Sequence, residues 1–268
     1  MVTPYSIIPA KGQVVPIILS VPHCGTRFPD DLKNEFHQQL IESPDDTDWF
    51  VHQLYDFVSS MGITMIHAVY SRWVIDLNRD PQSKPLYSDG RIITGLCPTT
   101  NFLGDSLYVD ARNEVDPVEV DRRLELYYKP YHQKIASLIA ERKAQFGKVL
   151  LWDCHSIREY VLTIQKEKFP GLILGDADGT SADASLIDTT LHTLKSSSFE
   201  VNHNHPFKGG YITRLFGKPS EKVHALQLEM TKTKYMDDSE KHYHQDRAEK
   251  MRIVLKKVFE SLINQMLK

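Results

Sequence analysis

Short apolar runs that give way to polar residues recur along the chain, and they predict buried strands that lead into loops. Each run is shorter than a typical helix, and a histidine, arginine, aspartate or glutamate follows within three residues. The predicted strands cover residues 14–21, 63–69, 148–152 and 224–228.

Amphipathic patterns predict helices between and after these strands, at residues 49–61, 116–146, 182–195 and 246–268. The second of these begins with a clear start signal. Asp116 is a suitable N-cap, Pro117 suits the first turn, and Glu119 stands where a capping box places its acid. Pro130 predicts a kink or break inside this helix.

Strands that alternate with helices predict an α/β fold, with a mixed, mostly parallel sheet flanked by helices. No Gly/Ser/Pro-rich linker divides the sequence, so we expect a single domain over residues 1–268. Ligand sites in such sheets lie beyond the carboxyl ends of the strands. The polar residues that follow the four strands therefore form one candidate site.

Composition narrows the class of protein. With 32 Lys+Arg against 35 Asp+Glu, the formal net charge is −3, which argues against nucleic acid or an anionic membrane as the main partner. Three cysteines without a CxxC pair favour a reducing compartment, and the first residues lack the basic and apolar regions of a signal peptide. We therefore expect a cytoplasmic protein.

Two histidines at strand ends suggest a metal site. His23 follows the first strand, and His155 follows the third. Together with a carboxylate from Asp48 or Asp46, they provide three N/O ligands and leave a fourth position for water, as in catalytic zinc sites. A chain with 12 histidines also places some of them at strand ends by chance.

Arginines and a glutamate add further candidates. Arg72 and Arg79 flank a short apolar segment, and guanidinium groups suit bidentate recognition of a carboxylate, although a structural Arg–Asp pair is the simpler interpretation. Glu229 ends the fourth apolar run, where partial burial would raise its pKa and suit it to acid/base work. A carboxylate paired at a strand end is the competing interpretation.

Taken together, several ordered motifs resemble the N-formylglutamate amidohydrolase family, a relative of the zinc carboxypeptidases and aspartoacylases. The resemblance covers nearly the whole chain. The motifs are SVPHCGTRFP (20–29), DDTDW (45–49), YSRWVIDLNRDP (70–81), KPLY (84–87), LLWDCHS (150–156), FKGGYITR (207–214) and HALQLEMTKTKYM (224–236).

The resemblance implies a carboxypeptidase-like fold and hydrolysis of N-formyl-L-glutamate to L-glutamate and formate, as in histidine degradation. It implies one zinc ion per chain and a small anionic N-acyl amino acid as substrate. The implied roles are metal ligation by His23, Asp48 (or Asp46) and His155, carboxylate binding by Asn78 and Arg79, and catalysis by Glu229 as general base. For this hydrolysis we further expect Arg72 to stabilise the oxyanion, and Arg214 and Tyr211 to bind the other carboxylate.

Three alternatives remain at this stage. The substrate could be another N-acyl amino acid, because one methyl group separates a formyl pocket from an acetyl pocket. A thiol hydrolase could use Cys154 or Cys24 beside its neighbouring histidine. A non-catalytic protein that binds acidic amino acids could keep the arginine clamp alone. The ligand types do not exclude other divalent metals, and the sequence specifies no oligomeric state.

Overall fold

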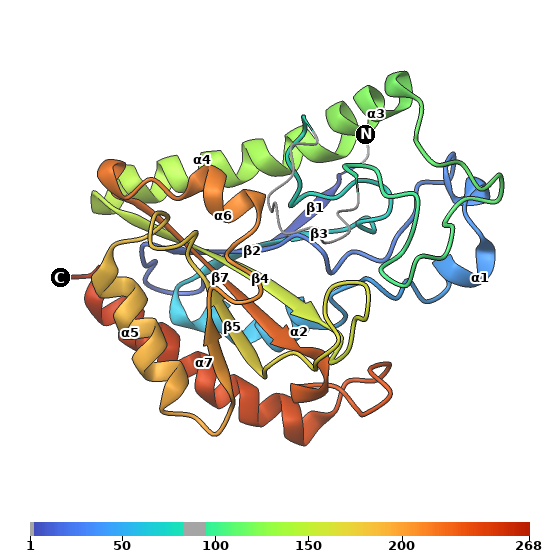
Figure 1. The fold of residues 1–268 in the computed structure, drawn as a ribbon. Coiled ribbons are helices and arrows are strands. Elements are labelled where there is room, and N and C mark those ends of the chain that lie inside the picture. Colours follow the sequence, from blue (N-terminus) through green and yellow to red (C-terminus); the bar gives the residue numbers. More distant parts are fainter. Residues whose placement is uncertain (1–2, 83–94) are drawn as a thin grey trace.

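The computed structural model of the chain describes residues 3–82 and 95–268. Within these residues, seven strands form one sheet in the order β1-β3-β2-β4-β7-β5-β6 (Figure 1). The strands are β1 (Tyr5–Ile8), β2 (Ile17–Val21), β3 (Thr64–Ala68), β4 (Val149–Ile157), β5 (Leu172–Gly175), β6 (Val201–His203) and β7 (Val223–Thr231).

Strand directions confirm the predicted mixed sheet. The four central strands β3, β2, β4 and β7 are parallel to one another. Strand β1 pairs antiparallel with β3, and β5 pairs antiparallel with β7. The carboxyl ends of the four central strands therefore meet at one edge of the sheet, where His23, His155 and Glu229 lie.

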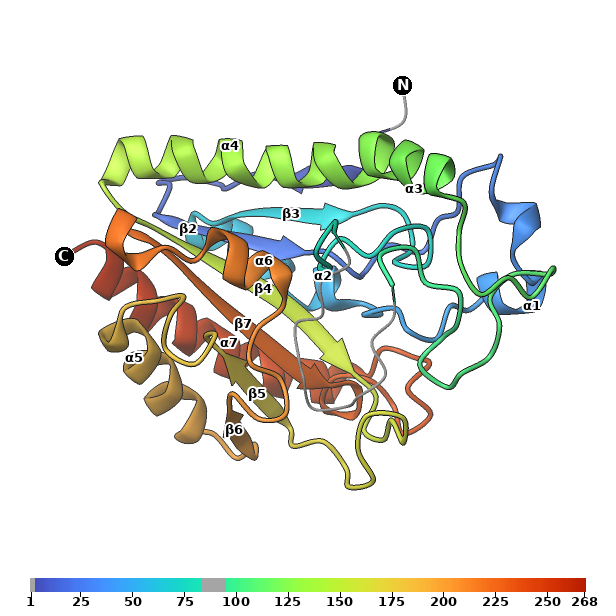
Figure 2. The same ribbon diagram turned by 45° about the horizontal axis from the view of Figure 1, so that its top comes forward.

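Helices cover both faces of the sheet (Figure 2). One face carries α3, α4 and α6, and the other carries α2, α5 and α7. The helices of these two layers are α2 (Val51–Leu54), α3 (Pro117–Arg123), α4 (Lys129–Phe146), α5 (Ala184–Lys195), α6 (Tyr211–Phe216) and α7 (Gln245–Met266). None of the helices described is both long and apolar enough to cross a membrane.

Shorter helical segments complete the described chain. They are η1 (Lys33–Glu35), α1 (Gln38–Ile41), η2 (Asp56–Met61), η3 (Leu124–Tyr128), η4 (Pro219–Glu221) and η5 (Lys232–Lys234).

The alternation of side chains along β4 separates core from site. Trp152 and Cys154 point into the apolar layer beneath α5 and α7, while Leu151 points into the layer beneath α4. Beyond Leu151, the positions on that second face become Asp153 and His155. Strand β7 changes in the same way, from Ala225 to Gln227 and Glu229. The α4 side of the sheet is thus apolar at one end and polar at the other.

Two predicted helices differ in detail from the structure. The helix expected at residues 49–61 is interrupted at Tyr55 and consists of α2 followed by the 3₁₀ segment η2. The helix expected at residues 116–146 starts as predicted, with the Asp116 carboxylate accepting from the Val118 N–H at 2.8 Å. The break expected near Pro130 takes the form of the π-helical segment η3 just before it.

The strands also differ from the prediction. Strands β4 and β7 continue past residues 152 and 228, so His155 and Glu229 lie within strands and do not follow them. The predicted strands end too early because polar residues alternate with apolar ones beyond residues 152 and 228, so the apolar run is interrupted although the strand continues. Strands β1, β5 and β6 were not predicted, since each is only three or four residues long.

Gly25 lets the turn after β2 touch the segment after β3. A Cβ atom built at Gly25 would lie 2.1 Å from the Tyr70 carbonyl oxygen, a backbone atom with little room to move. We expect Gly25→Ala to lower the free energy of unfolding by about 3 kcal/mol, as overpacking does at its upper range. Chemical denaturation measures this. Gly95→Ala is the control, because its Cβ would have no neighbour closer than 3.9 Å. Equal stability of the two variants would contradict the prediction.

Candidate metal centre

Four elements bring the candidate residues together. His23 lies in the turn after β2, and His155 lies in β4. Asp48 precedes α2, and its backbone N–H donates to the His23 carbonyl at 2.9 Å. Glu229 is paired with His155 in the register of β4 and β7. The turn, the loop and the two parallel strands thus converge at the polar end of the sheet.

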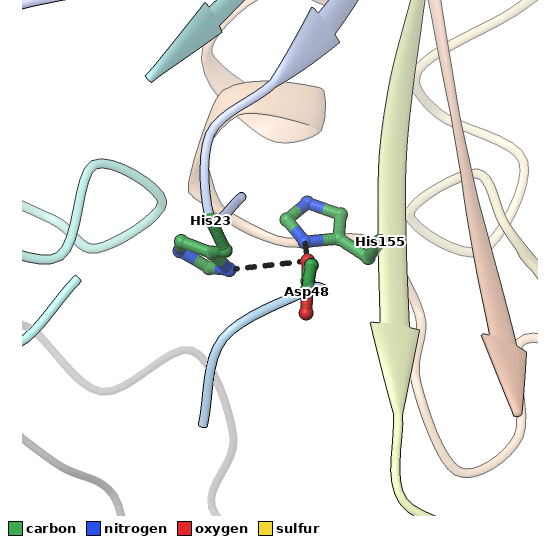
Figure 3. A group of neighbouring side chains, drawn as sticks. All are labelled: His23, Asp48 and His155. Carbon is green, nitrogen blue, oxygen red and sulfur yellow. Dashed lines mark hydrogen bonds and ion pairs between the residues drawn. The ribbon is translucent and has the colours of Figure 1, made fainter. Parts of the chain in front are cut away.

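His23, Asp48 and His155 form a compact buried group (Figure 3). The Asp48 Oδ2 atom lies 3.2 Å from His155 Nδ1 and 3.8 Å from His23 Nδ1. One ligand atom from each of the three residues lies within 4.8 Å of the others. Two imidazole nitrogens and a carboxylate oxygen at this separation suit a divalent metal such as zinc.

The far side of each imidazole is held by another carboxylate. His23 Nε2 lies 2.7 Å from Asp76 Oδ1, and His155 Nε2 lies 3.1 Å from Asp153 Oδ2. An imidazole that donates its Nε2–H to a carboxylate directs the lone pair of Nδ1 the other way, toward Asp48. Carboxylates behind metal-bound histidines fix the tautomer in this manner. The donor set and its surroundings therefore fit a metal ion.

Electrostatics separate the two histidines. Burial favours the neutral form of His155, but the carboxylates of Asp153 and Asp48 outweigh it and raise the pKa of His155 well above its usual value. Burial and the Arg72 charge lower the pKa of His23. Burial also opposes ionisation of Asp48, but the nearby histidines and Arg72 prevail and lower its pKa. Asp48 is thus held as a carboxylate, the form that binds a metal.

Asp76 connects the histidines to the arginines. Its Oδ2 atom accepts from Arg72 Nη2 at 2.6 Å and lies 3.4 Å from Arg79 Nη2. The Asn78 backbone N–H donates to Oδ1 at 2.9 Å. Burial opposes ionisation of Asp76, yet Arg72, His23 and Arg79 together hold its pKa well below the usual range. The sequence pattern suggests a structural Arg–Asp pair in this segment, but it does not indicate the contact of Asp76 with His23.

Asp46, the alternative third ligand, points elsewhere. Its Oδ2 atom accepts from Trp73 Nε1 at 2.8 Å, and its two oxygens lie 3.1 and 3.2 Å from the Phe102 backbone N–H. The group of potential ligands within the described residues contains Asp48 and not Asp46. Asp46 instead holds the Phe102 loop in place.

The predicted carboxylate-binding residues occupy different places. Arg79 and Asn78 line the cavity, but the Asn78 side chain accepts from the Ile212 N–H at 2.7 Å and lies 2.9 Å from His155 Nε2. Arg214 and Tyr211 do not line it. Arg214 Nε donates to the Gly209 carbonyl at 2.9 Å, and the Tyr211 ring packs against that of His132. Sequence order does not reveal these contacts, which depend on how α6 packs.

Glu229 faces a cavity of about 410 Å³ beside the group formed by His23, Asp48 and His155. Burial raises its pKa to about 8, with the Asp48 and Asp153 charges adding to the effect and His155 and Arg72 opposing it. The predicted upward shift is thus present. Side chains that line the same cavity but were not predicted come from three loops and one strand, at Asn101, Phe102, Thr163, Ile164, Phe207 and Gln227.

The thiol-hydrolase alternative does not fit the structure. Cys154 and Cys24 are buried in the apolar layer beneath α5 and α7. Because neighbouring residues of a strand point to opposite faces, the Cys154 thiol faces away from the cavity that His155 lines. Burial raises the pKa of both thiols, which disfavours the reactive thiolate.

Comparisons with known proteins agree with these observations. The N-formylglutamate amidohydrolase family model matches residues 15–236. The N-formylglutamate deformylase of Pseudomonas putida is 37% identical over 252 residues, which are 93% of this chain and 92% of that protein. The N-formylglutamate deformylase of Pseudomonas aeruginosa PAO1 is 39% identical over 265 residues, 96% of each chain.

Solved structures show the same fold. The crystal structure of N-formylglutamate amidohydrolase from Ralstonia eutropha JMP134 superposes with a TM-score of 0.81 at 25% identity, and covers 98% of this chain and 99% of its own. The Atu2144 protein of Agrobacterium tumefaciens superposes with a TM-score of 0.74 at 18% identity, over 97% and 96% of the two chains.

The KPLY motif at residues 84–87 lies outside the described residues.

The raised pKa of Glu229 predicts a stability cost that depends on pH. A carboxyl group with a folded pKa of about 8 and an unfolded pKa of about 4.3 adds no cost below pH 4, but lowers stability as pH rises between these values. We therefore expect Glu229→Gln to raise the Tm of metal-free protein by a few degrees at pH 8 and by much less at pH 5.

Thermal unfolding of chelated proteins across this pH range measures the difference. Glu260→Gln, an exposed change on α7, is the control and should show none. A Tm difference that stays constant from pH 5 to 8 would argue against a raised pKa.

Proposed function

Because the chain belongs to the N-formylglutamate amidohydrolase family, we propose that it hydrolyses N-formyl-L-glutamate to L-glutamate and formate with a bound zinc ion. One observation carries the metal assignment. The Nδ1 atoms of His23 and His155 lie near Asp48, while a carboxylate holds each Nε2 atom. This arrangement directs the Nδ1 atom of each imidazole toward Asp48, so that both nitrogens and the carboxylate could bind one metal ion.

His23, Asp48 and His155 would hold the metal. A zinc ion bound there would make water acidic enough to attack at neutral pH and would polarise the scissile carbonyl. Glu229 accepts the proton of the attacking water and returns it to the departing amine. In the metal-free site burial raises its pKa to about 8, and the charge of a bound metal ion would lower that value toward the neutral range, where a group can both accept and return a proton.

Arg72 stabilises the charge that develops on the carbonyl oxygen of the formyl group. It lines the cavity, and its guanidinium is oriented by Asp76 on one side and by the Phe102 ring, 4.8 Å away, on the other. A charge held in place before the reaction needs no reorganisation during it, which is the main source of such stabilisation. Asp76 and Phe102 therefore act as positioning residues for Arg72.

Arg79 binds a substrate carboxylate. Its side chain is 14% exposed at the cavity and shares Asp76 with Arg72. Asn78, whose amide lies against His155 and α6, steadies the imidazole from behind. Contacts of Arg214 and Tyr211 with a second carboxylate, and a cytoplasmic location, remain predictions from the sequence.

Removal of the metal tests the metal-dependent mechanism. We expect chelation to abolish formate release from N-formyl-L-glutamate, because the residues alone do not supply an acidic water, and we expect added zinc to restore it. Iodoacetamide should leave turnover unchanged, since the three cysteines are buried. Chelator-resistant turnover that iodoacetamide stops would instead support a thiol enzyme. Binding of N-formyl-L-glutamate without formate release would support a binding protein.

Replacement of the proposed base tests the role of Glu229. We expect Glu229→Gln to lower kcat by about 10²–10⁴-fold, the usual contribution of a general base, while zinc content stays at the wild-type value. Formate release and metal analysis measure the two effects. Glu221→Gln, an exposed change in η4 two residues before β7, should leave both unchanged. Wild-type kcat in Glu229→Gln would assign the proton transfer to another group.

A further inference from the structure

One wall of the cavity is apolar. Phe102, Ile157, Ile164 and Phe207 line it and pack together in one apolar cluster. The Phe207 ring also stacks on Phe169, with centroids 5.4 Å apart and an interplanar angle of 17°. The cavity therefore presents an apolar surface beside His23, Asp48 and His155, as pockets for small molecules commonly do.

This wall is held in place by hydrogen bonds. The Phe102 N–H contacts the Asp46 carboxylate, and its carbonyl accepts from the Thr163 hydroxyl at 2.6 Å. The Ile164 N–H donates to the Val161 carbonyl at 2.9 Å. Two loops distant in sequence are thus tied to each other. A preformed surface binds a ligand without the cost of ordering itself.

Among the residues that the structure describes, the arginines that line the cavity can balance one negative charge. Arg72 and Arg79 both contact Asp76, so the three side chains together carry one net positive charge. That charge matches one carboxylate of a substrate. The wall of Phe102, Ile164 and their neighbours presents carbon, against which a carboxylate would lose its hydration without gaining a partner.

We propose that the site also hydrolyses N-formyl amino acids whose side chains are apolar and about as long as that of glutamate. This inference rests on the proposed function. A formyl group has no carbon atom beyond its carbonyl, so the amino acid side chain is the part of the substrate that can contact the wall. In N-formyl-L-glutamate the two side-chain methylenes lie along the wall, and the terminal carboxylate extends past it.

The reaction is the same hydrolysis. Water forms a bond to the formyl carbon, the carbon–nitrogen bond breaks, and the proton taken by Glu229 passes to the nitrogen. Formate and the free apolar amino acid are the products, and neither an oxidant nor a second substrate takes part. Only the group that contacts the wall differs between the substrates.

The test compares kcat/KM for three substrates of the zinc-loaded protein: N-formyl-L-glutamate, N-formyl-L-methionine and N-formyl-L-alanine. Methionine reaches the wall, whereas the alanine side chain is too short. We expect the methionine substrate to exceed the alanine substrate by at least about tenfold, since one methylene in an apolar pocket is worth about 10–200-fold.

A variant of the wall identifies the surface responsible. Ile164→Gln places a polar group on the wall and should bring the methionine-to-alanine ratio toward one. Leu162→Gln is the matched control, because Leu162 lies two residues away, is 74% exposed and does not line the cavity. It should keep the wild-type ratio. Circular dichroism and zinc content check that both variants remain folded and loaded.

The outcomes separate this inference from the proposed function. Hydrolysis of the glutamate substrate, with methionine no better than alanine, would overturn the inference alone. A high methionine-to-alanine ratio that survives Ile164→Gln would overturn the assignment to this wall. Failure of the zinc-loaded protein to release formate from any of the three substrates would overturn the proposed function, and this inference with it.

Discussion

The site depends on the buried carboxylate of Asp76. A carboxylate that is 1% exposed is costly unless charged or polar donors surround it. Here the donors are His23, Arg72, Arg79 and the Asn78 backbone N–H. They come from the turn after β2 and the segment after β3, so the compensation of one charge joins two parts of the site. Loss of Asp76 would leave Arg72 buried without its closest partner.

The segment at residues 72–79 has no helix or strand of its own, and the neighbouring helices hold it from the other side. Arg123 donates to the Val74 carbonyl at 3.0 Å, Tyr128 to the Arg79 carbonyl at 2.7 Å, and His132 Nε2 lies 2.8 Å from the Leu77 carbonyl. Buried carbonyls need such partners. The π-helical η3 ends at Tyr128, consistent with the frequent occurrence of π-segments near functional sites.

Sequence reasoning located the parts of the site that depend on strand order. Parallel strands carry their carboxyl ends to one edge, so His23, His155 and Glu229 could be expected to converge. The third ligand depends on a loop, and nothing in the spacing of Asp46 and Asp48 indicates which carboxylate turns inward. The sequence does not indicate the partners of Asp76 either, because Asp76 and His23 are 53 positions apart in the chain and meet only in the folded structure. Irregular loops are determined by packing, which a local pattern does not encode.

Asp48 and Glu229 show how one cavity shifts the pKa values of two carboxyl groups in opposite directions. Both carboxyl groups are buried, and burial alone raises the pKa of each. Asp48 lies against the two imidazoles and keeps its charge, with its pKa lowered. For Glu229, His155 and Arg72 offset only part of the cost of burial, and its pKa stays at about 8. Opposite shifts in neighbouring carboxyl groups distinguish a permanent anion from a proton carrier. In the proposed function, the difference between the ligand Asp48 and the base Glu229 therefore comes from which side chain touches the histidines, and so from the loop before α2 and the register of β7.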